Sequence, residues 1–233
     1  MNAAATAAVD VVIPVHNGAA YLGAAIDSVL GQRGGPAIRV IVADDGSTDD
    51  SAALAAAYGP PVTLIRQPRS GAAAARNRGI AAGTAGLIAF LDADDLWPPD
   101  SLARRHAALA GDPALDAVFG MVEQFVCDRI AADRRDRLQC PPGKQPGYLL
   151  GAMLARSSVF ARFGRLDPTL AAADFIAWFA AAREGGLGAR VIDDLVLRRR
   201  LHDANLGLQR QDLRHAYLRV VRAVLRRRDG RDA

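Results

Sequence analysis

Runs of Val and Ile alternate with stretches of helical periodicity over the first half of the chain, starting with VDVVIPV. Short β-branched runs predict buried strands, and apolar residues three and four apart predict helices that pack on them. The predicted strands cover 9–15, 38–43, 62–66, 86–91 and 117–126, and the predicted helices cover 21–30, a stretch ending near 58, 71–82 and 102–110. Repeated strand–helix–strand units indicate an α/β fold, a mostly parallel, twisted sheet with helices on both faces. Such a sheet binds its ligand at the carboxyl ends of its strands.

The pattern is less regular after residue 126. The segment 128–147 is charged and rich in Pro and Gly, which predicts an exposed loop. Further predicted elements are a buried strand or close-packed turn over 147–155, helices over 156–163 and 174–184, strand-like runs over 191–196 and 197–201, and an amphipathic helix near 211–228. We therefore expect a disordered tail over 1–8, one domain over 9–206 with halves 9–126 and 127–206, and a basic helical segment over 207–233.

Composition narrows the class of protein. Hydrophobic residues make up 51% of the 233 residues and charged residues 23%, which is ordinary for a globular chain with one core. The two cysteines are too few for a disulfide framework and lack zinc-site spacing, so we expect a reducing, cytoplasmic setting. No apolar run approaches the roughly 18 residues that span a bilayer, and the first residues lack the basic and apolar regions of a signal peptide.

The net charge is +4, and arginine supplies nearly all of the positive charge because Lys144 is the only lysine. An arginine excess indicates contacts with phosphate or nucleic acid, or a GC-rich coding bias. We favour the coding bias and expect no nucleic-acid partner. The basic C-terminal helix has three interpretations: packing on the domain, packing on a second copy of the chain in a homodimer, or contact with nucleic acid or an anionic membrane.

Three carboxylates follow the predicted strand 86–91: Asp92, Asp94 and Asp95. Side chains alternate along a strand, so Asp92 and Asp94 are expected to project to the same side. Two such carboxylates repel each other unless a cation lies near, and hard ions such as Mg²⁺ and Mn²⁺ prefer oxygen ligands. One interpretation is a metal site with a polyanionic ligand, and the other is an acidic turn in which Asp95 or Asp100 caps the next helix.

Four ordered motifs in the first half and three weaker ones in the second half resemble a known family. They are VVIPVHNGAAYLGAAIDSVLGQ (11–32), VIVADDGSTDDS (40–51), SGAAAARNRGI (70–80) and GLIAFLDADDLW (86–97), then FGRLDPTL (163–170), ADFIAW (173–178) and RRLHDANL (199–206). Together they resemble the family 2 glycosyltransferases of the GT-A fold, which transfer a sugar from a nucleotide diphosphate donor with inversion. The motifs are specific as an ordered set, whereas one alone is weak.

The resemblance implies a donor site. Its residues are Pro14, His16 and Asn17 in a loop under the base, Asp44 or Asp45 on the base or ribose, Arg76 on the base edge or diphosphate, and Asp92 on the ribose. Pro14 offers no ladder donor, so it is expected to end the first strand. The alternatives are that 44–49 is only a helix-capping turn and that Arg76 is a solvated helix residue.

The resemblance also implies a metal site and a catalytic base. Asp94 is the expected ligand of Mn²⁺ or Mg²⁺, and His202 is a further ligand or phosphate contact, although a single His is usually structural. Asp174 is the expected general base, with helix capping as the alternative. Trp178, one helical turn later, is expected to wall the acceptor pocket or to pack in the core. Ala173 stands where a Glu commonly precedes the base.

These residues predict an inverting, metal-dependent transfer of a sugar from a nucleotide diphosphate sugar, with UDP favoured, to an acceptor hydroxyl. The acceptor is a saccharide, a lipid-linked compound, a small molecule or a peptide. The alternative, motivated by Ala173, is a nucleotide-sugar-binding or partner-binding protein without turnover. A haloacid-dehalogenase-type phosphotransferase, a dinucleotide dehydrogenase and a sugar nucleotidyltransferase fit less well, because their motifs are misplaced or missing.

Overall fold

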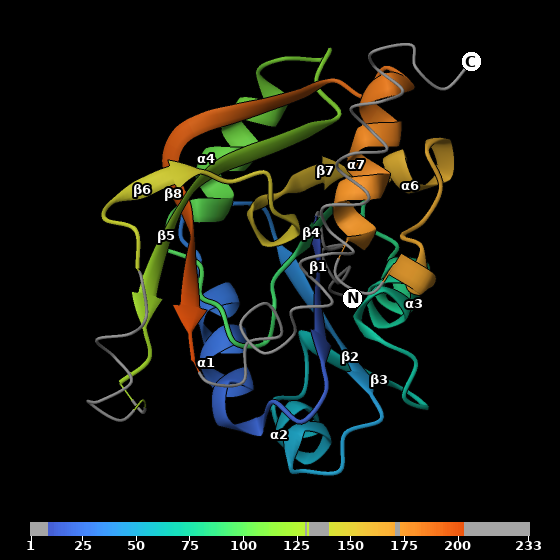
Figure 1. The fold of residues 1–233 in the computed structure, drawn as a ribbon, viewed down its shortest axis with the longest axis vertical. Helices are drawn as coiled ribbons and strands as arrows, with labels where there is room; N and C mark the ends of the chain where they lie inside the picture. Colours follow the sequence, from blue (N-terminus) through green and yellow to red (C-terminus); the bar gives the residue numbers. More distant parts are fainter. Residues whose placement is uncertain (1–8, 129, 131–139, 171–172, 203–233) are drawn as a thin grey trace, which may run out of the picture.

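Figure 1 shows the computed structural model, which describes residues 9–128, 130, 140–170 and 173–202. The predictions for the tail 1–8, for the segment 207–233 and for part of the loop after residue 128 lie outside these residues.

The first half of the chain builds the parallel part of the sheet. Its strands are β1 (Val9–Val15), β2 (Ile38–Asp45), β3 (Val62–Gln67) and β4 (Leu87–Phe90). The connecting helices are α1 (Ala19–Leu30), α2 (Ser51–Ala57) and α3 (Ala72–Ala82). β1 pairs in parallel with β2 and β4, and β2 pairs in parallel with β3. The predicted strand and helix order is confirmed for this half.

The second half extends the same sheet with strands of mixed direction. Its elements are α4 (Ser101–Ala110), β5 (Ala117–Val126), β6 (Lys144–Pro146), η1 (Leu150–Ala152), β7 (Leu154–Arg156), α6 (Val159–Arg162), η2 (Pro168–Leu170), α7 (Asp174–Glu184) and β8 (Ala189–Leu201). β7 is antiparallel to both β4 and β5, β6 is antiparallel to β5, and β8 is parallel to β5. The strand order in the described part is β3-β2-β1-β4-β7-β5-β6, with β8 on β5.

Two predictions for this half are wrong in detail. The sequence predicts a loop at 144–146, but these residues form β6 because they pair with 121–123 of β5. The sequence predicts two strand-like runs over 191–201, but they belong to one strand, β8, because two register shifts against β5 absorb the irregularity. Gly120 lies at these shifts, and a Cβ there would stand 2.5 Å from Cγ1 of Val196, so the crossing requires a glycine.

Helices cover both faces of the sheet, as the sequence predicts (Figure 1). On one face, α1, α2 and α4 pack in a core with Val11 and Ile13 of β1. On the other face, α3, α6 and α7 pack in a second core with Val12. Because side chains alternate along a strand, a run that is apolar at every position is buried on both faces.

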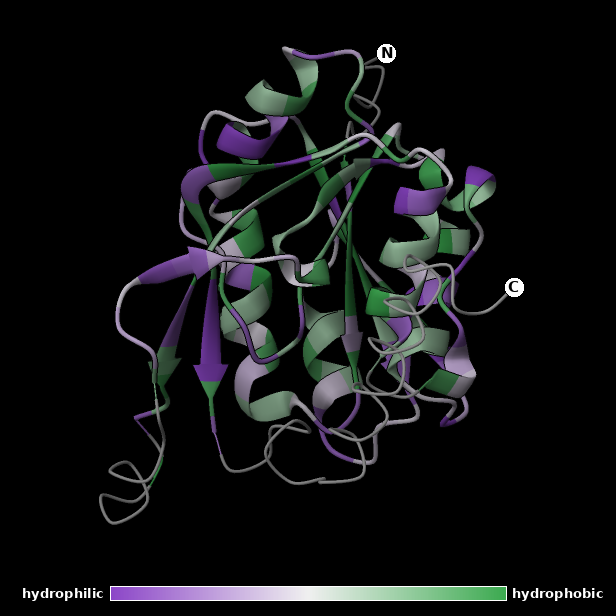
Figure 2. Ribbon diagram, turned by 45° about the horizontal axis from the view of Figure 1, so that its top comes forward, coloured by the Kyte–Doolittle hydropathy of each residue, from purple (hydrophilic) through white to green (hydrophobic). Residues whose placement is uncertain are grey.

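Figure 2 shows hydrophobic residues in the central strands and hydrophilic residues on β6 and the carboxyl half of β8. That half of β8 lies against the chain after β4, because Leu96 and Arg198 exchange backbone hydrogen bonds of 3.0 and 2.8 Å. Charged residues of the last described strand therefore reach the loop that carries the acidic motif. Separately, no helix in the described part of the chain combines the length and apolar character of a membrane span.

Candidate active site

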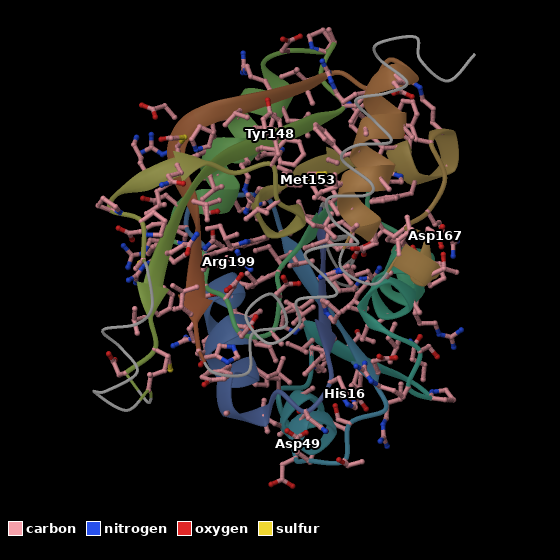
Figure 3. The ribbon with its side chains drawn as sticks, viewed as in Figure 1. His16, Asp49, Tyr148, Met153, Asp167 and Arg199 are labelled. Atoms are coloured by element: carbon pink, nitrogen blue, oxygen red, sulfur yellow. The ribbon has the colours of Figure 1, made fainter. Side chains whose placement is uncertain are left out.

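The loops after β1 and β2 are fastened together at the carboxyl edge of the sheet. Oδ1 of Asn17 accepts a hydrogen bond of 2.8 Å from the backbone N–H of Thr48. Ring Nδ1 of His16 lies 2.9 Å from the carbonyl oxygen of Asp45. Asn17 has φ of 51°, in the left-handed region that Asn adopts more readily than most residues. Figure 3 shows His16 and Asp49 at this edge, so the predicted base-binding loop lies where an α/β sheet binds ligands.

Pro14 and Asp44 lie on the neighbouring strands β1 and β2. β1 has the predicted bounds 9–15, so Pro14 is its last residue but one, and Val15 pairs with Asp44. Asp44 is fully buried and accepts hydrogen bonds of 3.0 Å from the backbone N–H of Ser47 and from Nε of Arg66. The carboxylate of Asp44 therefore fastens its own turn to β3.

Asp45 is buried and surrounded by donors. Burial raises the pKa of its carboxyl, but the hydrogen bonds together outweigh burial and hold the pKa below its ordinary value. The donors are Nε2 of Gln67 at 2.7 Å, the backbone N–H groups of Ser70 and Gly71 at 2.8 Å each, and the guanidinium of Arg69. Both oxygens therefore hold the loop that leads into α3. A contact between Asp45 and a donor nucleotide stays a prediction.

The acidic motif lies in a turn, which corrects the expectation that Asp92 and Asp94 project from a strand. β4 ends at Phe90, and the backbone N–H of Asp95 donates to the carbonyl of Asp92 at 3.0 Å. The backbone N–H of Leu91 still donates to the carbonyl of Val12 in β1 at 3.1 Å, and the turn over 92–95 then takes the chain away from the sheet. The Asp95 side chain accepts the backbone N–H of Arg200 at 2.8 Å and is buried, and burial raises the pKa of its carboxyl well above the ordinary value.

Arg76 of α3 joins two of the predicted site residues. Its Nη2 donates to Asp92 Oδ1 at 2.8 Å, and its Nη1 donates to Asp174 Oδ2 at 3.1 Å. Burial lowers the pKa of the guanidinium, but the two carboxylates outweigh burial and raise it. The solvated alternative for Arg76 is therefore wrong, since its side chain is only 13% exposed.

Asp94 lies against His202, the residue that follows β8. Asp94 Oδ2 is 2.8 Å from Nε2 of His202, and the His ring packs at 4.7 Å on Tyr21 of α1. The sequence separation is 108 residues, so the fold itself brings this carboxylate and imidazole together.

The chemistry of this pair fits a divalent cation held jointly with phosphate. Mg²⁺ is usually held by one or two carboxylates together with substrate phosphates, and Mn²⁺ also prefers oxygen ligands. Imidazole is more typical of zinc, copper, iron and nickel, so Asp94 is the better ligand of the pair for Mg²⁺ or Mn²⁺. Within the described residues no group of three His, Cys, Asp or Glu side chains converges. The protein would therefore supply Asp94 and His202, and a bound diphosphate would have to supply the remaining oxygens.

Asp174 begins α7 and is 4% exposed. Burial raises the pKa of its carboxyl, and the nearby Arg76 only partly offsets this rise. Trp178 is buried beside Phe160, with ring centroids 4.9 Å apart, and its indole N–H donates to the Gly164 carbonyl at 2.8 Å. Of the two expectations for Trp178, the structure shows the packing of its ring in the core, and a role in an acceptor pocket stays a prediction.

Residues that the sequence analysis did not select also hold the site. Asn77, next to Arg76, exchanges two hydrogen bonds of 2.7 and 3.1 Å with the backbone of Leu166. Arg200 donates from Nε to the carbonyl of Asp94 at 2.9 Å. Its position two residues before His202 on a strand, hence on the same side, is a signal that could have identified it.

The sequence model of the family described as Glycosyl transferase family 2 matches residues 10–165, about two thirds of the chain. The chain belongs to this family. The match covers β1 to β7 and includes the acidic turn. Asp174 and His202 of this glycosyl transferase family 2 chain lie beyond the matched residues.

Curated relatives resemble less than half of this family 2 chain. An uncharacterized glycosyltransferase of Nostoc sp. is 41% identical over 100 residues, which cover 41% of this chain and 31% of the relative. The succinoglycan biosynthesis protein ExoU of Rhizobium meliloti is 40% identical over 108 residues, which cover 45% of this chain and 31% of that protein. The matched part thus spans about a third of these relatives.

Solved structures resemble nearly the whole chain. Staphylococcus aureus TarS in complex with UDP-GlcNAc aligns with a TM-score of 0.70 at 15% identity, over 93% of this chain and 65% of that chain. The mannosyltransferase PcManGT of Pyrobaculum calidifontis, in complex with GDP-Man and Mn²⁺, aligns with a TM-score of 0.69 at 24% identity, over 93% of this chain and 64% of that chain. At these identities the similarity establishes the fold, which is the predicted GT-A fold.

Proposed function

We propose that this protein transfers a sugar from a nucleotide diphosphate sugar to an acceptor hydroxyl, with inversion at the anomeric carbon. One observation carries the proposal: the turn after β4 lies against residues of the second half of the chain. Asp94 lies against His202, and Asp92 is linked through Arg76 to Asp174. Such an arrangement suits a reaction in which a donor held by the first half meets an acceptor activated by the second half.

The donor half would span 9–126 and the acceptor half 127–206. His16 and Asn17, in the loop after β1, would lie under the base. Asp92 would accept the ribose hydroxyls, because its side chain is 47% exposed and can reach a ligand. Asp44 and Asp45, the last two residues of β2, already have partners within the protein, so they would contribute to the donor site by shaping its loops.

The bond changes follow from a single displacement. The acceptor oxygen attacks the anomeric carbon from the face opposite the diphosphate, and the bond from that carbon to the diphosphate oxygen breaks. Asp174 takes the proton of the attacking hydroxyl, and the nucleoside diphosphate departs with the bonding electron pair. The raised pKa of Asp174 favours this role, because a base with a pKa nearer the working pH accepts a proton more readily.

Asp94 and His202 would hold a divalent cation, Mn²⁺ or Mg²⁺, which would stabilise the charge that develops on the leaving diphosphate. The Mn²⁺ and GDP-Man bound by PcManGT, a protein of the same fold, support this assignment. UDP is the favoured nucleotide, supported by the UDP-GlcNAc complex of TarS.

The experiment is a calorimetric titration of UDP, GDP and TDP and their sugars, with Mn²⁺ or with a chelator. We expect one nucleotide to bind tightly only with metal, and Asp94→Ala to weaken this binding by at least about tenfold. Asp193→Ala is the matched control, because that side chain is 87% exposed and pairs only with Lys144 in the described part. Equal affinity of the wild type and Asp94→Ala, with metal and with chelator, would contradict the metal site.

A binding protein without turnover is the second candidate, because Ala173 stands where a Glu is expected and is fully buried. Metal-dependent nucleotide binding without donor hydrolysis or transfer to any acceptor would favour this candidate.

A further inference from the structure

Arg76 forms two ion pairs that donor binding alone does not explain. Both of its terminal nitrogens are engaged, one by Asp92 and the other by Asp174. These two carboxylates lie on different elements, since Asp92 follows β4 and Asp174 begins α7. One buried guanidinium therefore spans the two halves of the site.

The arrangement is costly for stability. The Nε–H of Arg76 is buried and, among the residues that the structure describes, has no hydrogen-bond acceptor. A buried donor without a partner destabilises the folded state, and such a group in a folded protein calls for an explanation. The guanidinium is placed so that its two terminal nitrogens bridge the two carboxylates, and in this position its Nε–H has no acceptor among the described residues.

The two carboxylates differ in exposure. The side chain of Asp92 is 47% exposed, whereas that of Asp174 is 5% exposed. The exposed carboxylate can reach a ligand and anchors the guanidinium from the solvent side. The buried carboxylate has little water around it, so Arg76 is the charge that compensates it.

The next residue of α3 strengthens the link. Asn77 exchanges hydrogen bonds in both directions with the backbone of Leu166, in the segment that leads to α7. Gly79 holds the same helix close to β1, because a Cβ there would stand 2.3 Å from Cγ1 of Val12. The position of Arg76 is therefore set by the sheet on one side and by the acceptor half on the other.

We propose that Arg76 is a positioning residue that orients the Asp174 carboxylate for proton abstraction, anchored by Asp92. This inference rests on the proposed function and refines it: Arg76 acts by orienting the general base Asp174 and not by binding the diphosphate. It also joins the two halves, because the residue that holds the base is itself held by the carboxylate expected to contact the ribose.

The first test is a double-mutant cycle of Arg76→Gln and Asp174→Asn, with transfer rate and donor affinity measured for each protein. We expect Arg76→Gln to lower kcat by at least about tenfold in the wild-type background, and by less than about threefold in the Asp174→Asn background. Arg76→Lys, which keeps the charge, should recover part of the loss. The matched control is Arg78→Gln, because Arg78 lies on the same helix and is exposed.

A diphosphate contact predicts a different outcome. Arg76→Gln would then raise the donor dissociation constant and would lower kcat/KM by the same factor in both backgrounds, and that result would overturn the proposal. Thermal unfolding of each variant separates a folding defect from a defect in positioning, and the double variant, which removes both buried charges, is expected to be the better folded one.

A second readout does not depend on turnover. The Asp174 carboxyl can be titrated by NMR, with Asp174→Asn to assign its signal, in the wild type and in Arg76→Gln. Loss of the neighbouring cation should raise its midpoint by at least about one pH unit. An unchanged midpoint would refute the Arg76–Asp174 link. A third outcome is that Arg76→Gln shifts the Asp174 midpoint while the wild type neither binds nor turns over nucleotide sugars. That result would overturn the proposed function and leave the Arg76–Asp174 link intact.

Discussion

Asp45→Asn distinguishes a structural carboxylate from a donor ligand. In the wild type, Oδ1 accepts from Gln67 and Ser70, and Oδ2 accepts from Gly71 and Arg69. An amide has one oxygen, so its NH₂ group must face one of these pairs of donors. The exposed Arg69 can turn to water, whereas the half-buried backbone N–H of Gly71 has a fixed direction. Leaving it without an acceptor, together with the loss of charge, costs about 3 kcal/mol and lowers Tm by roughly 6–12 °C.

The stability lost in Asp45→Asn depends on pH, because the pKa of Asp45 is lowered in the folded protein. A carboxyl whose pKa is lower in the folded than in the unfolded state stabilises the fold fully above its unfolded pKa of about 3.9. This contribution is lost as the pH falls through the folded pKa. The difference in unfolding free energy between wild type and Asp45→Asn should therefore be largest near neutral pH and shrink below about pH 4.

Urea unfolding followed by circular dichroism at several pH values measures this difference. Asp50→Asn is the matched control, because Asp50 lies in the same motif, is exposed and makes no side-chain capping bond to α2. The control should change stability by less than about 0.5 kcal/mol. If Asp45→Asn leaves stability unchanged but weakens donor binding, the carboxylate is a donor ligand and the structural argument is wrong.

Three further substitutions test the site and its supports. Asp174→Asn should keep donor affinity and lower transfer by at least about a hundredfold, so comparable turnover would remove it from the role of base. Gly79→Ala should lower the free energy of unfolding by about 1–3 kcal/mol through the clash with Val12, and it should cost less in a Val12→Ala background, where the clash is absent. Arg105→Ala should cost about 3 kcal/mol or more, because Arg105 is fully buried over the Trp97 ring at 4.2 Å, whereas Arg105→Met should cost less; equal losses would refute this reasoning.

The parallel half of the fold could be predicted because its signal is local. Val11, Val12 and Ile13 are apolar at consecutive positions, and each is buried on one face or the other of the sheet. The end of β4 could not be predicted in the same way. The turn over 92–95 ends the strand, and this turn is held by a residue far along the chain, since Asp95 accepts the backbone N–H of Arg200.

The candidate site was likewise predictable in its residues but not in their contacts. Residue types and motif order were enough to select Arg76, Asp92, Asp94, Asp174 and His202 from the sequence. Their partners were not predictable, because the contacts join residues 98 and 108 positions apart. Asp44 and Asp45, at the end of β2, looked equally available in the sequence, yet both are buried and already paired in the fold.

The place of the turn after β4 explains why so many chemical groups meet there. The sheet changes from parallel to antiparallel pairing at β4, because β1 on one side is parallel to β4 and β7 on the other side is antiparallel to it. An opening forms where the direction of the chain connections changes, and α/β sheets bind their ligands at such points. The turn is held from the donor side by Arg76 of α3 and from the acceptor side by β8, through the paired backbones of Leu96 and Arg198. Because Asp94 follows β4 of the first half and His202 follows β8 of the second half, the proposed metal site depends on the fold of both halves.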